Sequence, residues 1–258
     1  MFMSKFLIQK DSGAMDEERY FVLQQLRNSV RLHTYEEVLM SNLGQFNEKG
    51  WIPVGTVQFV QGYLRNVYGI KCENPIEIPK YLRTDEFLKR DYYFTDYHGI
   101  PRSGKFFLKD ASELKKFGEV VFADYLLFDY EKVNEFDNTL VLSKDHIYLV
   151  SSLYHIQAEY RVYVFNNTIQ GISFYNGDCT VFPDINLIKK AVLLISYNET
   201  WLRSYTIDVM VGKRGTALIE VHNFTSVGLY STLWGVDLLY AYRDGIDYLI
   251  HDNKELEV

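Results

Sequence analysis

The stretch "SYTIDVMVGKRGTALIEVHNF" (residues 204–224) reads as two apolar strands joined by a Gly-rich turn. Each strand carries one carboxylate near its middle, Asp208 in the first and Glu220 in the second. A carboxylate inside a half-buried strand is costly unless another group pairs with it. The stretch therefore predicts a β-hairpin on which two acids are held beside a partner of opposite charge.

The relative position of the two acids depends on the turn. Directly opposed residues of an antiparallel pair point to the same side of the sheet. A strict two-residue turn at 213–214 would set Asp208 opposite Ile219 and send the acids to opposite faces. An odd-length loop, such as 213–215, or a bulge would set Asp208 opposite Glu220. We therefore predict an odd loop or a bulge, and not a strict two-residue hairpin.

Two directly opposed carboxylates repel each other, and a divalent cation between them removes that cost. Mg²⁺ prefers hard oxygen ligands and is often held by one or two carboxylates together with substrate phosphates. Asp208 and Glu220 therefore indicate a metal-bound nucleotide. The alternative is two acids on a solvent-facing strand surface, remote from any chemistry.

The same alternation groups polar residues on neighbouring strands, because successive side chains of a strand point to opposite faces. In "AEYRVYVF" (158–165), Glu159 and Arg161 share one face. In the second strand of the hairpin, Glu220 and His222 share one face. The residues of that strand expected to face the core are Ala217, Ile219 and Val221. The predicted sheet thus presents acids, an arginine and a histidine on faces that can line a site.

Lys109 ends the apolar run "KFFLK", and a lysine at a strand end can reach a phosphate as a point charge. A surface lysine is the alternative. "KDAS" (109–112) also resembles the start of a nucleotidyltransferase motif with a nucleophilic lysine, but Ser112 stands where that motif needs glycine. His222 has no second histidine at a zinc-ligand spacing, and no P-loop, dinucleotide-binding or GxSxG motif occurs. Phosphate binding is the interpretation that agrees with the paired acids.

The composition excludes several broad classes. Of 258 residues, 47% are hydrophobic, which is ample for a packed core. The net charge of −7 and the lack of a basic tail give no signal for nucleic-acid binding. Neither Cys72 nor Cys179 has a CxxC partner, so a reduced, cytoplasmic setting is expected. The N-terminus lacks a signal-peptide core, and no apolar run reaches the length of a membrane span.

Local patterns predict three lobes, in the order α/β, small α+β and larger antiparallel α+β. Their predicted bounds are 1–83, 84–152 and 153–258. The predicted helices are 16–32, a short one opened by a capping box at 34–37, one after a turn at Gly55, one over 110–118, one capped by Asp184, and a C-terminal one broken at Gly245. Hairpin-type turns are predicted at 166–167 and 176–177.

The order of these features resembles the ATP-grasp fold, and most closely its phage and bacterial branch of presumed amide-bond-forming proteins. Three segments carry the resemblance. They are "GTVQFV" (55–60), the strand-end lysine of "FFLKD", and "EVHNFTSVGLY" (220–230), which is the most specific. The resemblance covers roughly residues 50 to 232. It implies an α+β fold in which two lobes grip a nucleotide, preceded by a small α/β lobe.

The resemblance implies a role for each matching residue. Lys109 would contact phosphate, Glu159 would hold the ribose hydroxyls, and Arg161 would face the phosphates or the acyl-phosphate. Lys109 and Arg161 would thus be the catalytic residues. The hinge whose backbone reads the adenine edge would be Ser151, Ser152 and Leu153. An earlier basic contact is matched loosely by Lys89 or Arg90.

The resemblance also implies the metal ligands. Asp208 and Glu220 match the Mg²⁺ ligands of the family. His222 stands where the family usually has asparagine, as a third ligand or a nearby contact. Asn223 would replace that asparagine only if the strand breaks there, because it faces the other side of a regular strand.

The implied activity is that of an ATP-dependent carboxylate–amine ligase. ATP would phosphorylate a carboxylate, and an amine would then displace phosphate from the acyl-phosphate, with Mg²⁺ and ATP as cofactors. The implied partners are small-molecule or peptide substrates in the cytoplasm, or in the host cytoplasm if the chain is phage-encoded, and neither nucleic acid nor membrane. Two alternatives stay open: an ATP-grasp-derived nucleotide-binding module without ligase activity, and a nucleotidyltransferase. No motif identifies the substrates or the oligomeric state.

Overall fold

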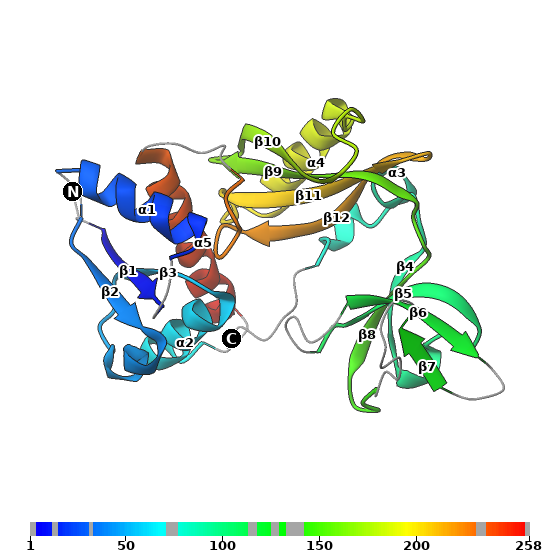
Figure 1. Cartoon of the computed structure of the whole chain (residues 1–258), viewed down its shortest axis with the longest axis horizontal. Coiled ribbons are helices and arrows are strands. Elements are labelled where there is room, and N and C mark those ends of the chain that lie inside the picture. The colour runs from blue at the N-terminus through cyan, green and yellow to red at the C-terminus, as the bar shows by residue number, and fades with distance from the viewer. Residues whose placement is uncertain are drawn as a thin grey trace.

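The computed structural model describes residues 4–11, 15–30, 33–70, 77–112, 118–124, 129–132, 142–230 and 236–255. The described chain contains three β-sheets, each with its own set of helices or turns, which confirms the predicted α+β class. In Figure 1 the first sheet lies on the left, the second at the lower right and the third at the upper right. None of the described helices combines the length and the apolarity needed to cross a membrane.

The first sheet is parallel and three-stranded, in the order β2-β1-β3. Its strands are β1 (Lys5–Lys10), β2 (Tyr35–Leu39) and β3 (Trp51–Val54). Its helices are α1 (Glu17–Asn28), capped by Asp16, and α2 (Val57–Tyr68), capped by Thr56. The strand, turn and helix expected around Gly55 are therefore confirmed.

The short helix predicted from the capping box at 34–37 is wrong. Residues 35–39 form β2, which pairs with β1 along its length, and a 3₁₀ helix, η1 (Met40–Gln45), follows. The edge of β1 offers an unbroken row of backbone donors and acceptors, and the amide of Phe6 already donates to the carbonyl of Thr34 at 3.1 Å. Pairing with this edge outweighs the local helix signal, because local propensity is a weak prior that tertiary context overrides.

The second sheet is antiparallel and five-stranded, in the order β4-β8-β5-β6-β7. Its strands are β4 (Tyr92–Asp96), β5 (Gly104–Asp110), β6 (Gly118–Asp124), β7 (Asp129–Lys132) and β8 (Ile147–Ser151). Short helices η2 (Lys80–Leu82) and α3 (Asp85–Leu88) precede it, and η3 (Tyr97–Gly99) follows β4. Residues 113–117 of the helix predicted at 110–118 lie outside the described residues, and Gly118 begins a strand rather than ending a helix.

The third sheet is antiparallel and four-stranded, in the order β10-β9-β11-β12. Its strands are β9 (Ile156–Phe165), β10 (Thr168–Gly177), β11 (Tyr205–Gly212) and β12 (Gly215–Asn223). Helix α4 (Ile185–Asn198), capped by Asp184 as predicted, packs on one face and buries an apolar cluster there. The opposite face carries Glu159, Arg161 and Asp208, and it is this face that turns toward the site.

Of the two predicted hairpin turns, one is confirmed. Asn166 and Asn167 both have positive φ and join β9 to β10. The turn predicted at 176–177 is wrong, because β10 runs through Gly177. A Cβ atom on Gly177 would lie 2.2 Å from the carbonyl oxygen of Gln157, so glycine here permits a close approach of two strands.

The C-terminal helix α5 (Val236–Glu255) packs on the first sheet, although it follows the third sheet in sequence. Figure 1 shows it behind β3, between α1 and α2. The predicted break at Gly245 is wrong, since the helix is continuous. A Cβ atom on Gly245 would lie 2.3 Å from the carbonyl oxygen of Phe224, so this glycine lets the helix approach the chain that leaves β12.

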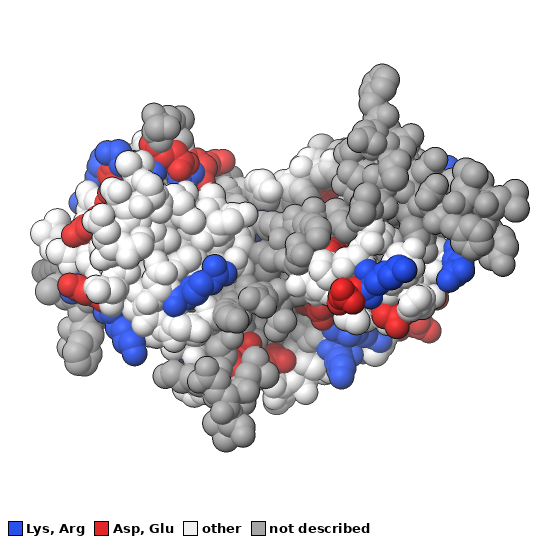
Figure 2. All heavy atoms as spheres, turned by 90° about the horizontal axis from the view of Figure 1, so that it is seen from below, with Lys and Arg blue, Asp and Glu red and all other residues white. Residues whose placement is uncertain are grey.

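Charged side chains are mixed in sign on the face seen in Figure 2. The described lysines and arginines alternate with aspartates and glutamates there and form no continuous basic surface. This distribution agrees with the net charge of −7.

Candidate functional site

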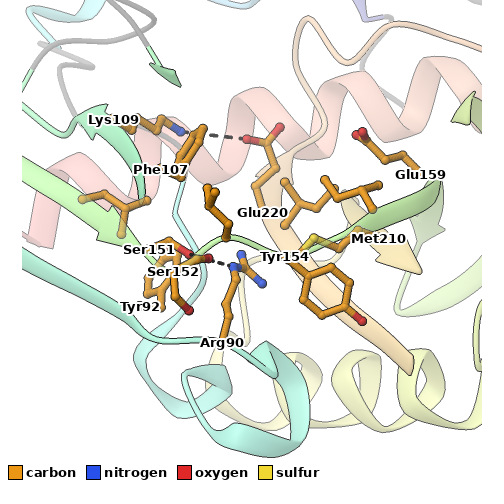
Figure 3. Close-up of a pocket in the computed structure, with 14 residues that line it drawn as sticks. Arg90, Tyr92, Phe107, Lys109, Ser151, Ser152, Tyr154, Glu159, Met210 and Glu220 are labelled. Atoms are coloured by element: carbon orange, nitrogen blue, oxygen red, sulfur yellow. Dashed lines mark hydrogen bonds and ion pairs between the residues drawn. The ribbon is translucent and has the colours of Figure 1, made fainter. Parts of the chain in front are cut away.

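A cavity of about 330 Å³ lies between the second and third sheets. We call it the inter-sheet cavity. The residues that line it are Arg90, Tyr92, Phe107, Lys109, Leu149, Ser151, Ser152, Leu153, Tyr154, Ile156, Glu159, Met210, Ile219 and Glu220. Figure 3 shows Lys109 and Glu220 facing each other at one end, and Arg90 and Tyr154 at the other. Sequence-predicted residues from both sheets therefore meet in one space.

The hairpin β11–β12 places its two acids side by side by means of a bulge. Gly212 pairs with Gly215, so the turn has two residues, and the predicted odd loop is wrong. The register shifts between Asp208 and Val209, which leaves Ile219 as the extra residue and sets Asp208 opposite Glu220. The bulge that was the second predicted alternative is thus confirmed, as is the shared face of the two acids.

The same bulge corrects one core assignment. Ile219 was expected to face the core with Ala217 and Val221, but it lines the inter-sheet cavity beside Glu220. Leu218 takes its place in the buried cluster under α4, together with Val221. A bulge adds one residue to one strand and reverses the alternation beyond it, so a strict period of two fails at this point.

Asp208 forms a bidentate ion pair with Arg161. The guanidinium Nε donates to Oδ1 at 2.7 Å and Nη2 donates to Oδ2 at 2.6 Å. Both side chains are largely buried, with 5% of Asp208 and 16% of Arg161 exposed. Burial by itself would lower the pKa of Arg161, but the hydrogen bonds and charge of Asp208 outweigh it and raise that pKa. Asp208 is therefore an ionised group with a fixed orientation.

Lys109 and Glu220 approach each other across the inter-sheet cavity. Lys109 lies near the end of β5, Glu220 lies on β12, and Nζ and Oε2 are 4.0 Å apart. The side chains are only 21% and 26% exposed. A cation from one sheet and an acid from the other thus meet at the end of the cavity where Figure 3 also places Glu159.

Glu159 accepts two hydrogen bonds from β10. The hydroxyl of Tyr175 donates to Oε2 at 2.9 Å, and Nδ2 of Asn176 donates to Oε1 at 2.9 Å. Glu159 stands opposite Met210 of β11, and both line the inter-sheet cavity. Its carboxylate is therefore oriented by two fixed donors while it remains at the cavity wall.

The predicted hinge residues line the cavity where β8 of the second sheet leads into the third sheet. Nε of Arg90 donates to the hydroxyl of Ser151 at 3.1 Å, and Nη1 donates to the carbonyl of Leu218 on β12 at 2.8 Å. The carbonyl of Leu153 accepts from Arg214 at 3.1 Å. Burial lowers the pKa of Arg90 to about 10, which still leaves it charged at neutral pH. Arg90, matched only loosely from the sequence, therefore ties the hinge to the third sheet.

The family follows from a comparison with known domain models. Residues 87–233, more than half of the chain, match the model of an ATP-grasp domain, family 2 of its clade. The chain belongs to this ATP-grasp family. The match spans β5 with Lys109, the hinge, and the hairpin β11–β12, which are the elements that build the inter-sheet cavity.

Solved structures support the ATP-grasp fold over nearly the whole chain. A RimK domain protein ATP-grasp from Sphaerobacter thermophilus is 11% identical with a TM-score of 0.53, and 96% of this chain and 98% of that chain are covered. The ATP-grasp ligase PsnB complexed with a minimal precursor is 11% identical with a TM-score of 0.52, covering 97% and 99%. D-alanine–D-alanine ligase from Bacillus anthracis complexed with ATP also matches, at 14% identity with a TM-score of 0.48, covering 98% of each chain. No curated protein matches this chain.

The donor set of this ATP-grasp domain fits Mg²⁺ only as a shared site. Among the described residues, no three His, Cys, Asp or Glu side chains gather to hold a metal ion. Asp208 and Glu220 provide adjacent hard oxygen donors, and Mg²⁺ usually completes its shell with waters and substrate phosphates. These two acids therefore fit a magnesium ion that binds together with a nucleotide, and not one held by protein ligands alone.

His222 and Asn223 are not among the residues that line the inter-sheet cavity. His222 stands opposite Thr206, and its ring nitrogen Nδ1 contacts the carbonyl oxygen of Asn223. The side-chain oxygen of Asn223 accepts from Thr225 at 2.8 Å. Sequence reasoning placed His222 in the metal set through the family pattern, and the structure places it at the end of β12, two residues beyond Glu220.

Sequence reasoning missed the segment 224–230 that follows β12. The carboxylate of Glu18 in α1 accepts from the amides of Val227 at 3.2 Å and Gly228 at 3.0 Å, and burial raises its pKa. A Cβ atom on Gly228 would lie only 3.3 Å from Arg161, so this segment passes directly beside the arginine. Nothing in "DEERYF" distinguishes Glu18 from an ordinary acid in the first turn of a helix, because its partners lie more than two hundred residues away in sequence.

Proposed function

We propose that this protein is an ATP-dependent ligase that joins a carboxylate to an amine through an acyl-phosphate, with lobes 1–83, 84–152 and 153–258 as predicted. The observation that carries the proposal is the convergence of Lys109, Glu159, Glu220 and the hinge 151–153 on one cavity. These residues come from two sheets and match the family pattern position by position. The matched family and the fold of PsnB, itself described as an ATP-grasp ligase, support the same assignment.

The cavity lining accounts for each part of a nucleotide. Apolar side chains of Leu149, Ile156 and Met210 surround the space beside the hinge, as a purine base requires. Glu159 offers carboxylate oxygens for ribose hydroxyls. Lys109 supplies the point charge for the phosphates, opposite Glu220.

The reaction needs positioning and charge rather than a protein nucleophile. The substrate carboxylate attacks the γ-phosphorus and ADP leaves; the amine then attacks the acyl carbon and phosphate leaves. Lys109 and Arg161 stabilise charge on the phosphoryl oxygens, and Asp208 holds the guanidinium of Arg161 in place. Mg²⁺, held by Asp208 and Glu220 together with the nucleotide, would neutralise the phosphate charge.

A nucleotide-binding module without ligase activity is the second candidate. Its support is the position of His222, which occupies the asparagine site of the family pattern and lies outside the cavity lining. Products separate the two candidates. A ligase releases ADP and phosphate in the presence of a carboxylate substrate and an amine such as hydroxylamine. A module binds Mg·ATP without turnover, and a nucleotidyltransferase releases pyrophosphate and labels Lys109.

Lys109→Ala is expected to weaken Mg·ATP binding by about tenfold to a hundredfold, since one charge-assisted contact to phosphate is removed. The measurement is a titration of the rise in melting temperature with Mg·ATP. The matched control is Lys105→Ala, which removes an exposed lysine from the same strand outside the cavity lining. Equal affinities of wild type and Lys109→Ala, or equal losses in both variants, would contradict the assignment of Lys109.

A further inference from the structure

Strand β10 carries a second bulge at the level of the site. Phe174 pairs with Tyr160 and Asn176 pairs with Glu159, so Tyr175 is the extra residue. Bulges re-aim side chains and are frequent next to active sites. The consequence here is that two consecutive side chains, Tyr175 and Asn176, both reach the carboxylate of Glu159. The two outer strands of the third sheet, β10 and β12, thus each carry one bulge beside the nucleotide site.

The ring of Tyr175 makes a second set of contacts. It stacks on the ring of Tyr230 with centroids 5.5 Å apart and an interplanar angle of 15°. The guanidinium carbon of Arg161 lies 5.8 Å from the centroid of Tyr175 and 5.5 Å from that of Tyr230. A guanidinium at this distance from an aromatic ring is attracted by its face. Tyr175 is therefore in contact with both Glu159 and Arg161.

The hydroxyl of Tyr175 stays a donor at physiological pH. Burial and the nearby acids Asp208 and Glu159 raise the pKa of Tyr175. The carboxylate of Glu159 has about four acceptor sites, of which Tyr175 and Asn176 use two. The remaining acceptor sites are oriented by these two donors and remain available to a ligand in the inter-sheet cavity.

We propose that Tyr175 is a positioning and specificity-determining residue of the nucleotide site. Its hydroxyl orients Glu159 toward the ribose hydroxyls, and its ring holds Arg161 beside Asp208. One side chain thus links recognition of the sugar to the position of the phosphate-facing arginine. This inference rests on the proposed function, and it adds that the site selects ribonucleotides over deoxyribonucleotides through Tyr175.

The test is Tyr175→Phe, which keeps the ring and removes only the hydroxyl. Binding of the Mg²⁺ complexes of ATP, 2′-deoxy-ATP and 3′-deoxy-ATP is measured by calorimetry, so no acceptor substrate is needed. We expect wild type to prefer ATP over at least one deoxy analogue. We expect Tyr175→Phe to bind ATP about fivefold to tenfold more weakly and to lose a similar factor of discrimination, as for one hydrogen bond to a charged group.

Two further variants keep the test decisive. Tyr197→Phe removes a hydroxyl from an α4 tyrosine that is 76% exposed, and it should leave affinity and discrimination unchanged. Asn176→Ala removes the other donor to Glu159 and should reduce discrimination in the same direction as Tyr175→Phe, which covers the case in which the tyrosine variant folds poorly.

The outcomes separate this inference from the proposed function. Failure of wild type to bind Mg·ATP would overturn both. Binding of ATP without any preference over the deoxy analogues, or an unchanged preference in Tyr175→Phe and Asn176→Ala, would overturn the role of Tyr175 alone. Reduced discrimination in both variants, with Tyr197→Phe unchanged, would support it.

Discussion

Asp208→Ala is expected to lower the free energy of unfolding by about 3 kcal/mol or more, because it leaves the largely buried guanidinium of Arg161 without its counter-charge. It is also expected to abolish the Mg²⁺-dependent part of the rise in melting temperature caused by ATP. Asp208→Asn should show both effects in milder form, since it keeps the side-chain volume and loses the charge. The measurements are urea denaturation and thermal melting with ATP, with and without Mg²⁺.

A double variant identifies the cause of the destabilisation. Asp208→Ala combined with Arg161→Met removes both charges, and it should be more stable than Asp208→Ala alone, because no uncompensated buried charge remains. Ala at the exposed Asp145 is the matched control and should be close to neutral. A double variant no more stable than the single one would contradict the ion-pair explanation. A full Mg²⁺-dependent shift in Asp208→Ala would exclude Asp208 as a metal ligand.

Gly245→Ala is expected to destabilise the protein by at least about 2 kcal/mol through overpacking, although alanine is the better helix former. The new Cβ atom would lie 2.3 Å from the carbonyl oxygen of Phe224, which a backbone atom cannot relieve without moving the chain. Because segment 224–230 follows directly and passes beside Arg161, the ATP-induced rise in melting temperature should also fall.

The control for the glycine variant is Gly44→Ala, where the added Cβ atom meets nothing within 4 Å. This variant should be neutral or slightly more stable, since alanine reduces the conformational freedom of the unfolded chain. Chemical denaturation of both variants measures the difference. A Gly245→Ala protein as stable as wild type would show that α5 does not approach the end of β12 as closely as the structure places it.

Much of the fold and of the site could be predicted because the signals are local. Alternating side chains placed Glu159 with Arg161, and the capping residue Asp184 marked the start of α4. The motif "EVHNFTSVGLY" pointed to the ATP-grasp family that the domain match shows. Lys109, Glu220 and the hinge 151–153 could be grouped in advance because the family pattern specifies their order along the chain, and they do line one cavity.

The contacts that could not be predicted depend on partners remote in sequence. The bulges at Ile219 and Tyr175 exist only relative to the register of a neighbouring strand, so no property of either strand alone reveals them. Strand β2 forms because β1 offers an edge, against its own helix signal.

The sequence by itself therefore determined the elements, the family and the acids of the hairpin, because short-range periodicity and motif order suffice for these. Only the tertiary structure decided how the acids are held. It pairs Asp208 with Arg161, Glu220 with Lys109, and Glu159 with the two donors of β10. Ion pairs and hydrogen bonds of this kind depend on distances of a few ångströms between side chains on different strands, and those distances are set only when the sheets pack.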